Sequence, residues 1–270
     1  MLILGLLGTG RLGTAIRDEA ASADDLEIGW AIGRCTPPAQ PVDVAVDVSH
    51  PDAVAAHLTW ASDTGTPLVI GTTGWDVRLI DAPDVPVLVA PNFSLGVAVV
   101  SRLARILGAY AATHLDLDVD LAVSETHHRH KVDSPSGTAL TLRDAVASGA
   151  GRSGTDVQTT SLRVGAVIGE HEVITSSPLE TITLRHSAHD RSLFARGALT
   201  AARWLVGQEP GTYTLDELAD DLLPELAAPA SISVASASPR AGTPTTLRTT
   251  STRHPHDNSS HHHTPHERSA

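Results

Sequence analysis

Lysine is almost missing from this sequence. The chain has 19 Lys and Arg side chains, and Lys131 is the only lysine among them. Aromatic residues make up only 3% of the chain, so its hydrophobic cores must be built from aliphatic side chains. The single cysteine, Cys35, excludes an internal disulfide.

A basic surface is also lacking, because acidic residues outnumber basic ones and give a formal net charge of -12. Proteins that bind nucleic acids or anionic membranes need a basic face. We therefore expect a small-molecule ligand, and neither a nucleic acid nor a membrane as partner. No apolar run approaches the length needed to span a bilayer, and Met1 leads into a strand-like run without the charged leader of a signal peptide. The sequence thus predicts a cytoplasmic protein.

A chain of 270 residues is long enough for two domains. In residues 1–94, short apolar runs typical of buried parallel strands alternate with helical patterns. Strands are predicted at 2–7, 26–32, 42–48, 67–70 and 85–90, and helices at 11–21 and 52–61. This alternation predicts an α/β fold with an N-terminal, Rossmann-like, doubly wound parallel sheet that binds a dinucleotide.

The first strand is followed by G-T-G-R-L-G at residues 8–13, a G-x-G-x-x-G sequence that opens a helix. In dinucleotide sites the first glycine permits the tight turn, the second lets the backbone approach the pyrophosphate, and the third lets helix and strand pack closely. The alternative is an ordinary turn between a strand and a helix. Small polar loops also end the third, fourth and fifth strands, at 47–51, 71–75 and 91–94, on the edge where open α/β sheets bind ligands. We interpret the three loops together as a cofactor site.

Cofactor preference depends on the end of the second strand, which reads Ile32-Gly33-Arg34. Sites that prefer NAD usually offer an acidic residue, about 20 residues after the glycines, to the ribose 2′-hydroxyl. Here a glycine stands in that region and Arg34 follows, so a 2′-phosphate would meet a cation. We expect NADPH to be preferred, or at least tolerated.

The pattern changes after residue 94. A helix is predicted at 95–110, a half-exposed strand at 115–125, a helix at 139–146, strands at 157–167, 172–176 and 180–186, and helices at 191–205 and 214–226. These elements predict a second α+β domain, residues 95–204, whose open mixed or antiparallel sheet pairs with a partner subunit. Residues 205–227 are predicted to complete the first domain. The tail at 228–270, rich in Ser, Thr, Pro and His, is predicted to be disordered.

Side chains capable of chemistry are concentrated in residues 124–140. Three imidazoles lie next to the only lysine: His127, His128, His130 and Lys131. Histidine can supply a proton near neutral pH, and an ammonium group can hold an anion. The turn at 134–138 leads into a helix whose free N–H groups form a further anion site. The alternative is a solvated loop with ordinary surface charges.

The sequence E-T-H-H-R-H-K-V-D-S-P-S-G-T-A, residues 125–139, resembles the signature of the 4-hydroxy-tetrahydrodipicolinate reductase (dihydrodipicolinate reductase) family. The similarity continues in family order through shorter motifs at 71–74, 92–94, 167–171 and 194–204. The glycine turn is more compact than the family's G-x-x-G-x-x-G. The resemblance implies reduction of 4-hydroxy-tetrahydrodipicolinate, through dihydrodipicolinate, to tetrahydrodipicolinate in diaminopimelate and lysine biosynthesis. NADPH or NADH would donate a hydride to C4 of the cyclic dicarboxylate.

The resemblance also implies roles for individual residues. His127 would exchange a proton, and Lys131 would be a second proton donor that also holds the substrate. Further substrate contacts are implied for His128, Ser136, Gly137 and Thr138. Contacts to the cofactor are implied for a larger set: Gly8, Thr9, Gly10, Arg11, Leu12, Gly13, Arg34, Gly71, Thr72, Thr73, Ala90, Pro91, Asn92 and Phe93. No metal is expected, and the family implies a homotetramer formed through the second sheet.

Two other functions remain open. One is another two-domain NAD(P)-dependent oxidoreductase that acts on an amino or keto acid. The other is a catalytically silent protein that binds NADPH, which the complete histidine and lysine set argues against.

Overall fold

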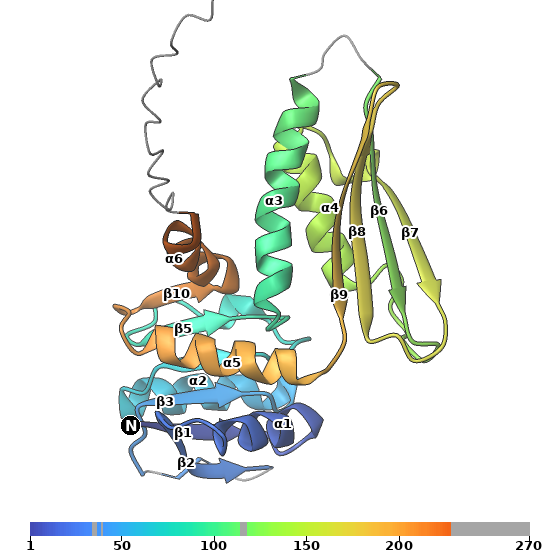
Figure 1. The fold of residues 1–270 in the computed structure, drawn as a ribbon. Helices are drawn as coiled ribbons and strands as arrows, with labels where there is room; N and C mark the ends of the chain where they lie inside the picture. Colours follow the sequence, from blue (N-terminus) through green and yellow to red (C-terminus); the bar gives the residue numbers. More distant parts are fainter. Residues whose placement is uncertain (34–36, 39, 114–117, 228–270) are drawn as a thin grey trace, which may run out of the picture. The chain divides into compact units, whose positions relative to one another are not determined.

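The computed structural model describes residues 1–33, 37–38, 40–113 and 118–227 (Figure 1). Three expectations therefore lie outside the described residues. These are the role of Arg34, the first residues of the strand predicted at 115–125 and the disorder of the tail from residue 228.

The first sheet has six parallel strands in the order β10-β5-β4-β3-β1-β2. The strands are β1 (Leu2–Leu7), β2 (Leu26–Ile32), β3 (Val44–Asp47), β4 (Leu68–Ile70), β5 (Pro86–Val89) and β10 (Gly211–Thr214). The predicted doubly wound parallel sheet is confirmed. Only β10 was missed, because this short run becomes a strand by pairing along β5, far from it in sequence.

Both faces of this sheet are buried under helices (Figure 1). Alternate residues of each strand point to opposite faces, so Leu4 and Leu6 enter the core that contains Ile16 of α1 (Arg11–Ala20) and residues of α5 (Ser192–Leu205). Leu7 enters the core on the other face, with residues of α2 (Pro51–Thr64). Burial on both sides explains why these strands are continuous apolar runs in the sequence.

The second sheet has the order β7-β6-β8-β9. Its strands are β6 (Asp120–His127), β7 (Gln158–Arg163), β8 (Gly169–Ser176) and β9 (Thr181–Ala188). β6 pairs antiparallel with β8, and β8 with β9, whereas β6 and β7 are parallel. The sheet is therefore mixed, as the predicted fold class allowed.

Two helices, α3 (Leu95–Ala112) and α4 (Gly137–Gly149), lie side by side along one face of this sheet (Figure 1). The absence of a side chain at Gly108 permits this close approach, because a Cβ there would lie only 2.1 Å from the Val146 carbonyl oxygen. The remaining elements are α6 (Leu215–Ala227) and two short 3₁₀ turns, η1 (Val77–Leu79) and η2 (Gly154–Asp156). Residues 137 and 138, which are predicted to contact the substrate, lie at the start of α4.

Helix α3 is more apolar than the sequence analysis allowed. Its 18 residues have a mean hydropathy of 1.4, so by length and composition alone the helix would suffice to cross a bilayer. Seven of its residues are buried, however, and Arg102 on the same helix forms an ion pair with Asp220 of α6. We interpret α3 as a core helix, because its buried face packs against α4 and the second sheet.

The predicted division of the chain at residues 94 and 204 stays a prediction. Residues 1–228 form one compact unit by their contacts. Within this unit, α5 contributes Ala198, Leu199 and Leu205 to the core of the first sheet.

Candidate functional site

The carboxyl edge of the first sheet carries a cavity. β1 and β3 are neighbours although β2 follows β1 in sequence, so the chain switches sides between them. Open α/β sheets bind ligands at such a switch point. A cavity of about 720 Å³ opens there, and its walls include the glycine turn and the loop after β3: Gly8, Thr9, Gly10, Gly33, Val48, Ser49 and His50. The predicted cofactor turn thus lies where the topology favours a nucleotide.

The three glycines of the turn differ in what surrounds them. Gly8 has a φ of +115°, a conformation that side chains rarely adopt. A Cβ at Gly13 would lie 2.0 Å from the Gly8 carbonyl oxygen, so this glycine permits close packing of α1 on the turn. A Cβ at Gly10 would meet no protein atom within 4 Å, which leaves space for a ligand. The arrangement fits a pyrophosphate at Gly10.

This difference predicts opposite outcomes for two alanine variants. Gly13→Ala is expected to lower the free energy of unfolding by about 1–3 kcal/mol, because the added methyl overpacks the turn. Gly10→Ala is expected to change stability by less than about 1 kcal/mol, but to raise the cofactor KM. Denaturant unfolding and steady-state kinetics of both variants measure this. Equal destabilisation by the two substitutions would contradict the assignment.

A buried polar network supports the loop after β3, and the sequence analysis missed it. The Asp47 carboxylate is fully buried and lies 2.7 Å from His57 Nδ1. It also accepts hydrogen bonds from the Ser49 backbone N–H and the Thr72 hydroxyl, both at 2.9 Å. Burial raises the pKa of Asp47, but the hydrogen bonds from His57 and Ser49 outweigh it, and the pKa lies below its usual value. The side chain of Thr72, predicted to contact the cofactor, is therefore engaged in this network.

A larger cavity of about 940 Å³ joins the loops after β4 and β5 to the region of residues 127–141. Most of the predicted site residues line it: Leu12, Gly71, Thr73, Ala90, Pro91, Asn92, Phe93, His127, His128, Lys131, Ser136, Gly137 and Thr138. Gly8, Thr9 and Gly10 line the smaller cavity instead, and three further predicted residues that the structure describes line neither cavity. Arg11 lines a neighbouring hollow with His128, while Gly13 and Thr72 are buried in the turn and the network.

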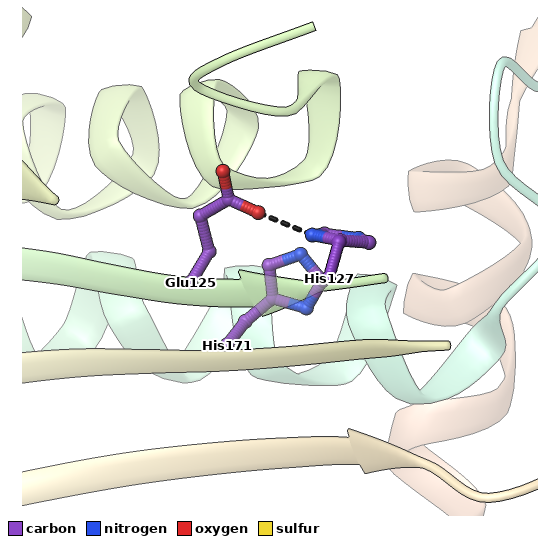
Figure 2. Close-up of side chains that lie close together, drawn as sticks. All are labelled: Glu125, His127 and His171. Carbon is purple, nitrogen blue, oxygen red and sulfur yellow. Dashed lines mark hydrogen bonds and ion pairs between the residues drawn. The ribbon is translucent and has the colours of Figure 1, made fainter. Parts of the chain in front are cut away.

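The end of β6 brings the acid–base side chains together. Glu125 and His127 are two residues apart on one strand, so both point to the face covered by α4 (Figure 2). The strand register places His171 of β8 opposite Glu125, and Arg163 of β7 opposite His127. Glu125, His127 and His171 are 2%, 7% and 4% exposed. The sheet thus gathers four ionisable side chains from three strands.

The Glu125 carboxylate is held from three sides. One oxygen accepts hydrogen bonds from the Arg163 guanidinium at 2.8 Å and from the Ser136 backbone N–H at 3.2 Å. The other oxygen contacts His127 Nδ1 (Figure 2). Burial raises the pKa of Glu125, but the Arg163 and His127 contacts outweigh it and lower the pKa to about 2. Glu125 is therefore an anion at any physiological pH.

The two buried imidazoles favour the neutral form. Burial lowers the pKa of His127, and Glu125 opposes this effect only in part. Burial lowers the pKa of His171 to about 4. The ring centroids of His127 and His171 lie 5.0 Å apart at 74°, and His171 Nε2 is 3.4 Å from the Ser136 hydroxyl. His171 is thus a neutral wall of the site, whereas His127 borders the cavity.

Anion-binding groups line the cavity next to His127. The Lys131 ammonium lies 2.8 Å from Asp133, and this hydrogen bond lowers the pKa of Asp133. Ser136 caps α4 by accepting a hydrogen bond from the Ala139 N–H at 3.2 Å, so the first N–H groups of the helix border the cavity. The Asn92 amide donates to the Thr138 hydroxyl at 3.0 Å. The loop after β5 thereby meets the start of α4.

A carboxylate and two imidazoles are also possible ligands for a metal. The ligand atoms of Glu125, His127 and His171 lie within 4.8 Å of one another. Both oxygens of Glu125 are already engaged, one of them with the Arg163 cation, and Lys131 adds a second positive charge nearby. A divalent cation would have to displace these contacts, so we interpret the cluster as a hydrogen-bonded acid–base group.

This site defines a class of protein. A doubly wound sheet presents a glycine turn at its switch point, and its edge shares a cavity with acid–base side chains of a second sheet. This combination is typical of two-domain oxidoreductases that bind a nicotinamide cofactor.

Comparison with known families identifies the member of this class. The family described as "Dihydrodipicolinate reductase, N-terminus" matches residues 35–93, and "Dihydrodipicolinate reductase, C-terminus" matches residues 96–219. The chain belongs to the dihydrodipicolinate reductase family, whose members are oxidoreductases that use a nicotinamide cofactor. The match of the N-terminal family begins after the compact glycine turn.

Individual relatives agree with this assignment. A 4-hydroxy-tetrahydrodipicolinate reductase of Gluconobacter oxydans is 41% identical over 78% of this chain and 94% of its own length. The enzyme of that name from Zymomonas mobilis is 38% identical over 80% of this chain and 96% of its own length. The dipicolinate-bound dihydrodipicolinate reductase of Paenisporosarcina sp. TG-14 has the same fold, with a TM-score of 0.68 and 21% identity over 81% of this chain and 99% of that chain.

Proposed function

We propose that the protein reduces 4-hydroxy-tetrahydrodipicolinate, through dihydrodipicolinate, to tetrahydrodipicolinate. The observation that carries this proposal is a single cavity lined both by the sheet-edge loops at 71–73 and 90–93 and by His127, Lys131 and the start of α4. The family membership and the names of the relatives support the substrate. The reaction would belong to diaminopimelate and lysine biosynthesis, in the cytoplasm, and the active form would be a homotetramer.

Each part of the cavity has a chemical task in this proposal. A bound NADPH or NADH supplies the hydride for C4 of the substrate. Lys131 and the N–H groups at residues 137–138 bind the two carboxylates of the substrate. The Lys131 ammonium gives up its contact with Asp133 to bind one of them. His127 donates the proton that neutralises the electron-rich carbon formed by hydride addition.

The cofactor preference is a separate proposal that rests on the sequence around Arg34. NADPH is expected to have a lower KM than NADH. Arg34→Gln is expected to raise the KM for NADPH about tenfold and to leave that for NADH unchanged, because a hydrogen bond to a charged group contributes ~1.5 kcal/mol. Steady-state kinetics with both cofactors measures this. A strong NADH preference in the unaltered chain would refute it.

A coupled assay tests the reaction itself. Aspartate semialdehyde, pyruvate and the preceding synthase generate the substrate in place, and the absorbance of NADPH follows its reduction. The proposal expects oxidation of NADPH that depends on both the synthase and this protein. Cofactor-dependent turnover of another amino or keto acid, but not of the synthase product, would favour the alternative oxidoreductase. Cofactor binding without any turnover would favour the silent binding protein.

A further inference from the structure

We propose that Glu125 is a positioning residue for His127. Glu125 holds the His127 imidazole as the Nδ1–H tautomer and leaves the Nε2 atom for the substrate. This inference rests on the proposed function for its catalytic meaning. It deepens that function by naming the group that prepares the proton donor.

The geometry carries the proposal. Glu125 and His127 lie on the same face of β6, and the carboxylate contacts Nδ1 of the ring (Figure 2). An ionised carboxylate can only accept a hydrogen bond, so Nδ1 must carry the proton. The ring borders the cavity, and Nε2 is the nitrogen that Glu125 leaves unoccupied.

Arg163 and Ser136 determine which oxygen of Glu125 faces His127. Both donate to Oε1 of Glu125, which leaves Oε2 for His127. The same Ser136 caps α4, where the substrate carboxylates are expected to bind. Glu125 therefore links the orientation of the His127 ring to the start of the anion-binding helix.

The proton balance follows from these contacts. Protonated His127 carries hydrogens on both nitrogens. It gives the Nε2 proton to the electron-rich substrate carbon, keeps the other proton on Nδ1 in the hydrogen bond to Glu125, and regains a proton at Nε2 from solvent in the next cycle. Glu125 remains a carboxylate throughout, because its contact with Arg163 opposes protonation.

Several charged groups act on the His127 ring. Glu125 of β6 favours the charged imidazole, Lys131 and Arg163 of β7 oppose it, and His171 of β8 is a neutral neighbour. Loss of the Glu125 charge therefore lowers the pKa of His127. The alkaline limb of the kcat/KM profile, where His127 loses its proton, should move to lower pH.

Glu125→Gln separates positioning from mere structure. The glutamine oxygen is expected to keep the hydrogen bonds from Arg163 and Ser136. The side-chain NH₂ then faces Nδ1 of His127. Nδ1 then becomes an acceptor, and the neutral ring changes to the Nε2–H tautomer. We expect kcat to fall at least about tenfold, with the cofactor KM unchanged. Glu172→Gln is the matched control, because this carboxylate lies on the same sheet and pairs with Arg185 away from the cavity.

Nitrogen NMR of ¹⁵N-histidine-labelled protein reads the tautomer directly and does not depend on turnover. Loss of signals in His127→Asn assigns the ring. The expected result is Nδ1–H in the unaltered chain and in Glu172→Gln, and Nε2–H in Glu125→Gln. An Nε2–H ring in the unaltered chain overturns the proposal, and this result does not depend on whether the Glu125 variant folds. An unchanged tautomer together with an unchanged pH profile in Glu125→Gln also overturns it. Failure of the coupled assay would instead reject the proposed function.

Discussion

Replacement of His127 by alanine is expected to lower kcat by about 10² to 10⁴. The ring is the buried imidazole that borders the larger cavity, and it has a carboxylate on its other nitrogen. The cofactor KM should change little, because His127 is assigned to the substrate side of the cavity and the pyrophosphate is assigned to the glycine turn. Steady-state kinetics in the coupled assay measures both parameters.

His130→Ala provides the matched control for this variant. His130 belongs to the same histidine cluster but is exposed, and it lines a neighbouring hollow rather than the larger cavity. Its removal is expected to leave kcat within about threefold, as for most surface substitutions. Near-normal turnover of His127→Ala would exclude the proposed proton transfer.

Lys131→Ala is expected to lower kcat/KM for the dicarboxylate by about 10² or more, because one charge-assisted contact and one proton donor are lost together. Lys131 is the only lysine, and its ammonium reaches the cavity beside the start of α4. Arg129→Ala is the control, since Arg129 is an exposed cation of the same loop. If both variants lose activity equally, the effect is general electrostatics and the specific role of Lys131 is wrong.

Much of the fold follows from local patterns in the sequence. The apolar runs of β1, β3 and β5 are buried on both faces, so their composition alone marks them as strands. The short β10 strand exists because it pairs with β5, which is more than a hundred residues away in sequence. The parallel pairing of β6 with β7 depends on the crossover through α4 and on register, which local composition does not determine.

The candidate site could also be predicted from the sequence only in part. The H-H-R-H-K motif identified His127 and Lys131, but the predicted strand ended at Glu125, whereas β6 continues to His127. With the longer strand, period-two alternation places Glu125 and His127 on one face, so the pair could have been found from the sequence. The partners Arg163 and His171 come from other strands, and only the pairing register brings them to the same place. The Asp47 and His57 pair was missed because it depends on how α2 packs against the end of β3.

The central claim is hydride transfer to C4 of the ring within the cavity bordered by His127 and Lys131. It is tested most directly with NADPH deuterated at the transferable position of its nicotinamide, in the coupled assay. NMR of the product should show one deuterium at C4, absent when the synthase or this protein is omitted. Oxidation of the cofactor with no deuterium in the product, or with deuterium at another carbon, would contradict the account.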